Sequence, residues 1–98
     1  MFLNIRIYDN AREKVEVARR VREGFVEPLG SRLPGFRGWY SFDGGDGRFG
    51  SVTMFDNAEA AAAYNLAADD WVSANDLSDL LPEAPAIVIG KVIASVEA

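Results

Sequence analysis

Polar side chains alternate with aliphatic ones in the first segment of the chain, residues 2–8. Asn4, Arg6 and Tyr8 fall at every second position, so in a β-strand they share one face. A guanidinium on such a face can neutralise a phenolate or a carboxylate, and a phenol can orient a polar ligand atom. The pattern therefore predicts substrate binding by Arg6 and Tyr8. The favoured alternative for Arg6 is an ion pair with Asp43 or with an acidic residue of a second chain.

Two further segments, residues 36–42 and 49–55, supply side chains of the same character. Their aromatic and β-branched residues predict strands, and one face of each matches Asn4 in polarity. That face carries Trp39, Ser41, Ser51 and Thr53. We expect the three hydroxyl side chains to bind substrate, because no basic partner for a nucleophile lies near them. The Trp39 indole and the Asn4 amide need hydrogen-bond partners when buried. A ligand is one such partner, and a protein group is the alternative.

The composition excludes several classes of site. The chain has no His and no Cys, which removes the commonest general base, the thiolate nucleophile and the usual ligands of zinc, copper and haem. We therefore expect no metal and no cofactor. The Gly-rich stretch at 43–47 lacks the spacing of a calcium loop and the Lys of a phosphate loop, so it predicts a hairpin turn. A net charge of −5 argues against nucleic acid and anionic membranes as partners.

The elements that position these side chains follow the order β-α-β-β-α-β. The alternating segments predict strands at 2–8, 36–42, 49–55 and 86–96. Asn10 and Glu13 have the spacing of a capping box, so the first helix should begin near Ala11. Asp56 and Glu59 repeat that spacing before an Ala-rich helix that ends at about residue 74. The apolar stripes of the two helices comprise Val15, Ala18, Val21, Phe25 and Leu29 in the first, and Ala61, Tyr64, Ala68 and Trp71 in the second.

This order predicts an α+β fold, a ferredoxin-like sandwich with a four-stranded antiparallel sheet and both helices on one face. Residues 1–98 are expected to form one domain. With Leu3, Ile5 and Ile7 placed against the helices, the mixed polar and aromatic face stays open and exposes more apolar surface than a monomer usually does. We therefore predict a homodimer whose stacked sheets enclose a lumen for a small planar ligand. A plain dimer interface with an incidental cavity is the alternative.

The amino terminus predicts no secretory signal, because Met1 leads directly into a strand pattern. No apolar run approaches the roughly 20 residues that span a bilayer. We therefore expect a cytoplasmic protein without a membrane partner.

Three segments carry motifs of a known family. LPGFRGWYSF occupies 33–42, GSVTMFDNAEAAAAYNLAADDWV occupies 50–72, and PAIVIGKV occupies 85–92. Together they resemble the antibiotic biosynthesis monooxygenase-like branch of the dimeric α+β barrel superfamily, over nearly the whole chain in element order. The resemblance implies a dimeric α+β barrel. It does not choose an activity, because the superfamily includes monooxygenases, haem-degrading enzymes, isomerases, cyclases and members without demonstrated activity.

The resemblance implies two kinds of site, of which one is excluded. Haem-degrading relatives use an Asn on the first strand, a Trp on the second helix and an iron-ligating His. Asn4 and Trp71 fall near the first two positions, but the chain has no His. Cofactor-independent, quinone-forming relatives use an Asn, a Trp and a Tyr to orient a polyphenol. Asn4, Trp39, Tyr40 and Trp71 could supply these catalytic groups, although the helical stripe favours core packing for Trp71.

The sequence thus leads to one function and one alternative. We expect a homodimer that binds a small aromatic or polyketide-like metabolite, with cofactor-independent monooxygenase chemistry as its activity. The alternative is a non-catalytic binding or assembly module of the same fold.

Overall fold

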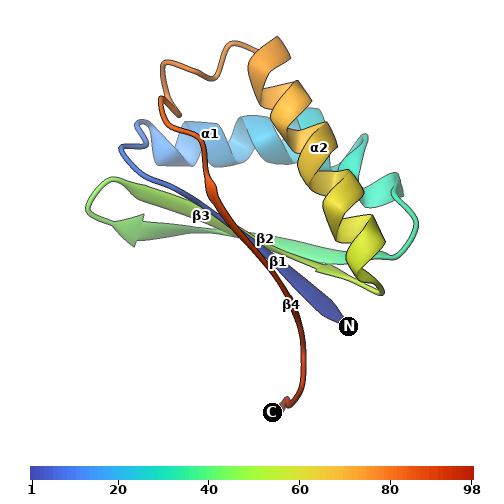
Figure 1. Cartoon of the computed structure of the whole chain (residues 1–98). Coiled ribbons are helices and arrows are strands. Elements are labelled where there is room, and N and C mark those ends of the chain that lie inside the picture. Colours follow the sequence, from blue (N-terminus) through green and yellow to red (C-terminus); the bar gives the residue numbers. More distant parts are fainter.

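A four-stranded antiparallel sheet with the strand order β2-β3-β1-β4 forms one layer, and the helices cover one of its faces (Figure 1). The computed structural model describes residues 1–98. Its elements are β1 (Phe2–Tyr8), α1 (Lys14–Val21), the π-helical turn η1 (Arg22–Val26), the 3₁₀ turn η2 (Gly30–Arg32), β2 (Phe36–Gly45), β3 (Arg48–Phe55), α2 (Ala58–Ala74) and β4 (Ala86–Lys91). The predicted ferredoxin-like α+β fold is confirmed.

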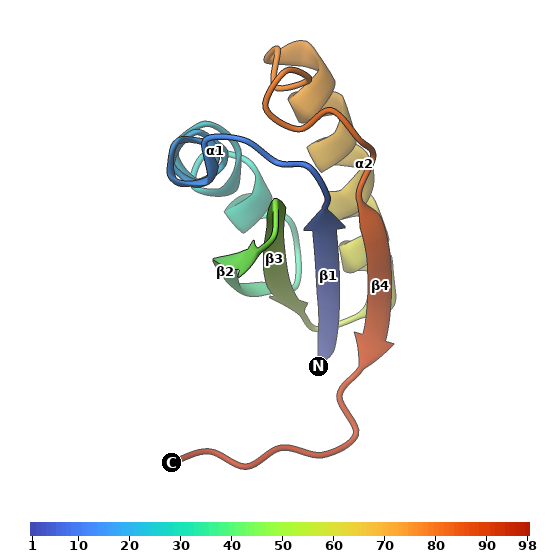
Figure 2. The ribbon, with the colours of Figure 1, turned by 90° about the vertical axis from the view of Figure 1, so that its left-hand side faces the viewer.

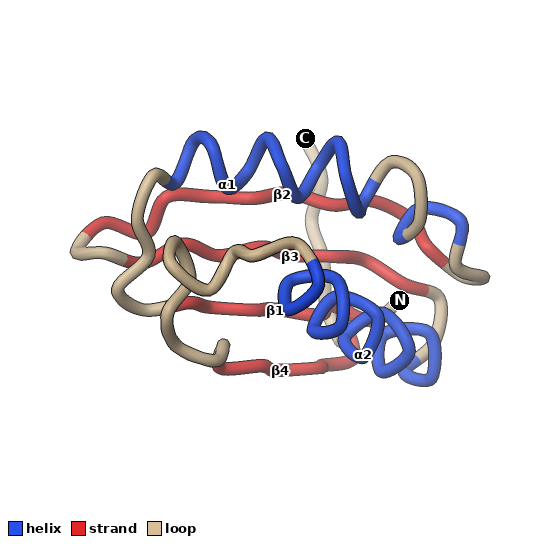
Figure 3. The backbone as a smooth tube through the Cα atoms, turned by 90° about the horizontal axis from the view of Figure 1, so that it is seen from above, coloured by secondary structure: helices blue, strands red, loops and turns tan.

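Seen from above, α1 runs along β2, and α2 crosses the half of the sheet that contains β1 and β4 (Figure 3). Two apolar clusters fill the space between the layers. One surrounds Tyr8, Val17 and Phe49, and the other surrounds Phe25 and Tyr64. Neither helix has the length and apolarity needed to cross a membrane.

The register of the sheet aligns polar residues in rows beneath the helices. Asn4 of β1 pairs with Thr53 of β3, which in turn pairs with Trp39 of β2. In the next row Arg6 pairs with Ser51. Paired residues of neighbouring strands point to the same face, so these side chains form one continuous surface.

A register shift between Phe36 and Gly38 changes the alternation in β2. Residues three apart would ordinarily point to opposite faces, but Phe36 and Trp39 both pack against the cluster around Phe25 and Tyr64. The extra residue at the bulge lets both aromatic side chains face the helices.

The predicted assignment of the faces of β1 is wrong. Asn4 and Arg6 are 0% and 3% exposed, whereas Leu3, Ile5 and Ile7 are only half-buried on the opposite face. The polar and aromatic residues therefore face the helices, and the lumen predicted between two stacked sheets would not contain them. The alternation in β1 could not distinguish the two faces, because the partners that make burial of Arg6 possible lie on α2.

The start of the first helix also differs from the prediction. Asn10 and Glu13 adopt left-handed conformations, with φ of 55° and 50°, and α1 begins at Lys14. The Ala11 N–H donates to the Gly47 carbonyl and the Arg12 N–H donates to the Leu80 carbonyl, so the backbone before Lys14 is tied to two loops rather than to a helix.

Both helices depart from the predicted pattern in detail. In α2 the N-cap is Asn57, whose side chain accepts a hydrogen bond from the Ala60 N–H at 2.8 Å, one residue after the expected Asp56. Its end at Ala74 is as predicted. On the first helix Val15 is exposed and Val17 is buried, so the stripe that faces the sheet is rotated from the predicted one.

The last strand is shorter than predicted. β4 ends at Lys91, and after the hydrogen bond from the Val92 N–H to the Met1 carbonyl the chain extends away from the sheet (Figure 2). The predicted strand residues up to 96 therefore lie in this exposed tail.

Candidate functional site

Arg6 lies at the centre of a polar cluster between the sheet and α2. Its guanidinium donates to the side-chain oxygen of Asn65 at 3.0 Å, to the Tyr8 hydroxyl at 2.7 Å and to the Asp69 carboxylate at 2.6 Å. The side chain is 3% exposed. A buried cation is stable only when its charge and its N–H groups have partners, and α2 supplies two of these three partners.

The charge of this cluster is well defined. Burial acts to lower the pKa of the Arg6 guanidinium, but the Tyr8 oxygen and the Asp69 carboxylate act in the opposite direction and hold the pKa above its ordinary value. Arg6 therefore places a permanent positive charge beneath the helices.

Asn4 and Asn65 link the cluster to the next row of the sheet. Each amide donates to the other, at 2.9 Å and 2.8 Å. The oxygen of Asn65 accepts from both Asn4 and Arg6. This arrangement fixes the orientation of both amides, because an exchange of oxygen and nitrogen in Asn65 would set a donor against the Arg6 guanidinium.

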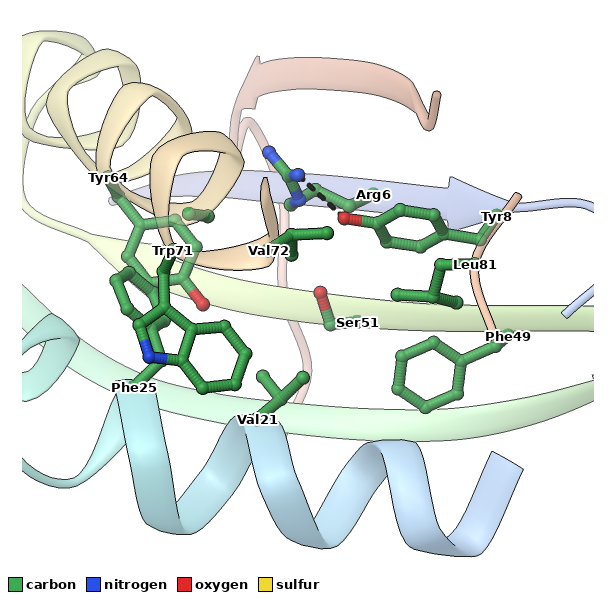
Figure 4. A pocket seen from close by; sticks show the side chains of 11 residues that line it. Arg6, Tyr8, Val21, Phe25, Phe49, Ser51, Tyr64, Trp71, Val72 and Leu81 are labelled. Carbon is green, nitrogen blue, oxygen red and sulfur yellow. Dashed lines mark hydrogen bonds between the residues drawn. The ribbon is translucent and has the colours of Figure 1, made fainter. Parts of the chain in front are cut away.

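A small enclosed cavity lies beside Arg6 (Figure 4). Its volume is about 20 Å³, which is room for about one water molecule. Arg6, Ser51 and the hydroxyl-bearing rings of Tyr8 and Tyr64 bring polar groups to a wall that is otherwise apolar. The remaining lining residues are Val21, Phe25, Phe49, Ala68, Trp71, Val72 and Leu81.

Two buried polar atoms beside the Tyr64 hydroxyl make no hydrogen bond of regular geometry. They are the indole nitrogen of Trp39 and the hydroxyl oxygen of Thr53. Burial raises the pKa of the neighbouring Tyr64 phenol above its ordinary value of 10.0, while Thr53 and Arg6 act to lower it. Buried polar atoms without a partner are rare in native proteins, so these atoms are well suited to a ligand oxygen or a bound water.

Trp71 separates the cavity from the outside. Its side chain lines both the enclosed cavity and an outer groove of about 410 Å³ between α1 and the end of α2. Gly24 makes room for the indole, since a Cβ at that position would lie 2.7 Å from the ring atom Cζ2 of Trp71. Gly24 belongs to η1, and such π-helical turns occur frequently at functional sites.

The structure brings together most of the predicted site residues. Asn4, Arg6, Tyr8, Trp39, Ser51, Thr53 and Trp71 all lie between the sheet and the helices. Ser41 pairs with Ser51 on the same face of the sheet, but it lines an outer groove beside Lys14 and Ala18 and not the enclosed cavity. Tyr40, expected from the resemblance as a catalytic group, pairs with Val52 and is 68% exposed, so it lies on the other face of the sheet from Asn4 and Trp39. The partner of Arg6 is Asp69 rather than Asp43, which instead pairs with Lys14 at 2.5 Å.

Three members of the site, all on α2, are not predicted from the sequence. They are Tyr64, which was assigned only to the apolar stripe, and Asn65 and Asp69. A signal was available for Asn65, because it follows Ala61 by four residues and so extends the buried stripe with a polar side chain. Asp69 follows Asn65 by the same step.

Comparison with known proteins places this geometry in a structural class. No family model and no curated protein matches the chain. Three similar solved structures illustrate the likeness. A dimeric ferredoxin-like protein from an uncultured marine organism has a TM-score of 0.73 and 20% identity, and the match covers 99% of this chain and 91% of that one.

The other two similar structures contain small molecules. The monooxygenase from the gene ActVA-Orf6 of Streptomyces coelicolor, in complex with nanaomycin D, has a TM-score of 0.71 and 16% identity, with 99% and 91% of the two chains covered. The haem-degrader MhuD of Mycobacterium tuberculosis, with two haems in its active site, has a TM-score of 0.70 and 17% identity, with 99% and 100% covered. The chain thus has the fold of the antibiotic biosynthesis monooxygenase-like proteins, as its motifs predict.

Proposed function

We propose that this protein binds a small aromatic or polyketide-like metabolite between its sheet and its helices. The observation that carries the proposal is the buried cluster around Arg6, whose cation lines a cavity with aromatic walls and bonds to the Asn65 amide. The Asn4 amide and the two buried polar atoms of Thr53 and Trp39 lie in the neighbouring row of the same sheet face. A core built only for stability gains little from buried polar groups without partners. Apolar walls with a few placed polar groups are typical of small-molecule sites.

The cavity must widen to admit such a ligand, because its present volume of about 20 Å³ is far below the roughly 300 Å³ of typical ligand pockets. The sheet side of the cavity is held by strand pairing and by the Asn4–Asn65 bonds. The helix side contains Trp71 and Val72, which also line outer grooves. Opening on the helix side joins the cavity to these grooves.

Cofactor-independent monooxygenation is the reaction class that we propose for the site. In such a reaction a phenol or anthrone is ionised, and its electron-rich anion reduces O₂. The CH₂ group of the anthrone, or a ring C–H carbon of the phenol, becomes a carbonyl. One oxygen atom of O₂ enters the product and the other leaves as water with the two hydrogen atoms that the substrate loses, so no external reductant is consumed. Arg6 would stabilise the organic anion, while Asn4 and Trp39 would orient its oxygen atoms. Tyr40 has no role in this scheme because it lies on the other face.

The site does not fit haem. The chain has no His or Cys to ligate iron, and no cluster of metal-ligating side chains is found. The Tyr8 hydroxyl, one of two phenols in the cavity wall, is already bonded to Arg6. We therefore derive no step through haem.

Homodimerisation through the open sheet face belongs to the same proposal. Leu3, Ile5 and Ile7 are half-buried there, and Tyr40 and Val88 are 68% and 60% exposed. An apolar sheet face of this kind favours a partner, and a two-fold pairing covers the same face of both subunits. The ligand site lies on the other face, so each subunit would carry its own site.

Oxygen consumption tests the catalytic part of the proposal. The protein should consume dissolved O₂ with a dihydroxynaphthalene or an anthrone, and Asn4→Ala and Trp39→Phe should lower the rate without changing the molecular mass in solution. Tyr40→Phe is the matched control, since it alters an aromatic ring on the opposite face and should leave the rate unchanged. Ligand binding without turnover across a panel of phenols would instead support the non-catalytic binding module.

A further inference from the structure

The ion pair between Arg6 and Asp69 is asymmetric in its burial. The two side chains are joined at 2.6 Å, but Arg6 is 3% exposed and Asp69 is 53% exposed. The Asp69 carboxylate makes one side-chain hydrogen bond, which is the bond to Arg6. Transfer of the Asp69 carboxylate into water therefore costs little free energy for Asp69 itself, because the carboxylate is already half hydrated.

Arg6 stays in place without Asp69. Its other bonds are to neutral groups, the Asn65 oxygen at 3.0 Å and the Tyr8 hydroxyl at 2.7 Å. These contacts fix the guanidinium but do not neutralise it. A guanidinium has five N–H donors, and the bonds to Asn65, Tyr8 and Asp69 leave two N–H groups without a protein acceptor. The site therefore has both a charge and donors for a second anion.

Asp69 also lies in the wall of the groove through which a ligand would reach Arg6. A groove of about 270 Å³ runs along the loop that follows α2, and Asp69 lies in its wall. Tyr8, Val72 and Leu81 line both this groove and the enclosed cavity beside Arg6. An anionic group that enters from the groove thus reaches the guanidinium at the position of the Asp69 carboxylate.

We propose that Asp69 is a displaceable counter-ion and that the site selects aromatic ligands with an anionic oxygen, a carboxylate or a phenolate, over neutral aromatic ligands of the same shape. This inference rests on the proposed ligand binding and specifies its chemistry. The ligand anion replaces Asp69 on Arg6, and the Asp69 side chain turns into water. A neutral ligand cannot make this exchange, because displacement of Asp69 would leave the buried cation unpaired.

A pair of matched probes tests the inference. 2-Naphthoate and 2-naphthamide have the same ring system and differ in charge, and their binding to the full chain can be measured by calorimetry or by quenching of tryptophan fluorescence. We expect naphthoate to bind more tightly than naphthamide. In Asp69→Asn the competing charge is gone, so the affinity for naphthoate should rise by about tenfold, the size of one charge-assisted hydrogen bond.

Asp70→Asn is the control for this variant. It removes the same charge from the neighbouring exposed position, which makes no hydrogen bond to Arg6. We expect it to change the affinity for either probe by less than about twofold, because an exposed charge that does not contact the ligand is screened. A comparable rise in both variants would show a general effect of net charge and would overturn the role of Asp69.

Arg6→Lys supplies the complementary measurement. The ammonium keeps the charge but cannot bond to Asn65, Tyr8 and a ligand in the same geometry, so the preference for naphthoate over naphthamide should shrink. Equal affinity of the unaltered protein for both probes, or a rise of both affinities in Asp69→Asn, contradicts the counter-ion exchange and leaves the proposed binding of aromatic ligands intact. Failure of both probes to bind any variant contradicts the proposed function as well.

Discussion

The side-chain amides of Asn4 and Asn65 form a reciprocal pair, in which each donates to the other across 61 positions of sequence at 2.9 and 2.8 Å. This pair joins the central strand β1 to α2 beneath the helical layer. Because the Asn65 oxygen also accepts from Arg6, the same residue positions the cation of the candidate site. Stability and ligand binding therefore depend on one amide.

Replacing Asn65 should destabilise the fold strongly. Asn65→Leu leaves the buried Asn4 amide and one Arg6 N–H without a partner, which should lower the free energy of unfolding by about 2–4 kcal/mol. Asn4→Leu combined with Asn65→Leu should lower it by less than the sum of the single changes, since the amides are then removed together. Urea unfolding measures both, and additive effects would show that the pair is not coupled.

Gly24→Ala should move Trp71 with little loss of stability. The new methyl group would overlap the indole, so the ring must turn, while the better helix propensity of Ala offsets about 1 kcal/mol of the strain. In a Trp39→Phe background, Trp71 is the only tryptophan, and its fluorescence should become easier to quench with acrylamide. Gly90→Ala is the control, because nothing lies within 4 Å of the added Cβ. An unchanged Trp71 signal would argue against the close contact.

A charge on the open sheet face should separate the proposed dimer. Ile5→Lys places an ammonium at the centre of the half-buried face, where burial by a partner would be costly. Sedimentation velocity should then detect a monomer. Val15→Lys, at an exposed position of α1, should leave the assembly unchanged. Equal sedimentation of the unaltered protein and Ile5→Lys would contradict the proposed interface.

The carboxylate of Glu16 should titrate at low pH. Hydrogen bonds from Arg19 and Arg20 lower its pKa from the ordinary 4.5 to about 2. The folded pKa lies below the unfolded one, so the contribution of Glu16 to stability is present above pH 4.5 and is lost as the pH falls towards 2. Carboxyl NMR titration checks the value, and titration near 4.5 would mean that both arginine bonds are absent in solution.

The order of elements could be predicted from the sequence because each strand and helix carries its own period. The sequence did not predict which face of the sheet lies under the helices. Leu3, Ile5 and Ile7 are more apolar than Asn4 and Arg6, and apolarity normally marks the side under the helices. Here the partners on α2 reverse the assignment, and their contacts span about 60 positions. A local pattern contains no information about such pairs.

The candidate site could be predicted only in part, because a local pattern does not reveal contacts between residues far apart in the sequence. The alternation of side chains along the strands predicted that Arg6, Ser51 and Thr53 share one face of the sheet, as they do. Trp39 was placed with them, although a bulge separates it from Phe36. Tyr40 was assigned by analogy with a family and lies on the other face. The loop backbone that holds Asn10 and Glu13 in left-handed conformations depends on distant carbonyls that the capping pattern does not reveal.

The location of bound ligand tests the central claim most directly. With ¹⁵N-labelled protein and 2-naphthoate, we predict chemical-shift changes at the Trp39 and Trp71 indole N–H groups and at the side-chain amides of Asn4 and Asn65. Backbone amides of the open face, such as those of Tyr40 and Val88, should stay unchanged. Changes confined to the open face, with the Asn4 and Asn65 amides unaffected, would contradict a ligand site beneath the helices.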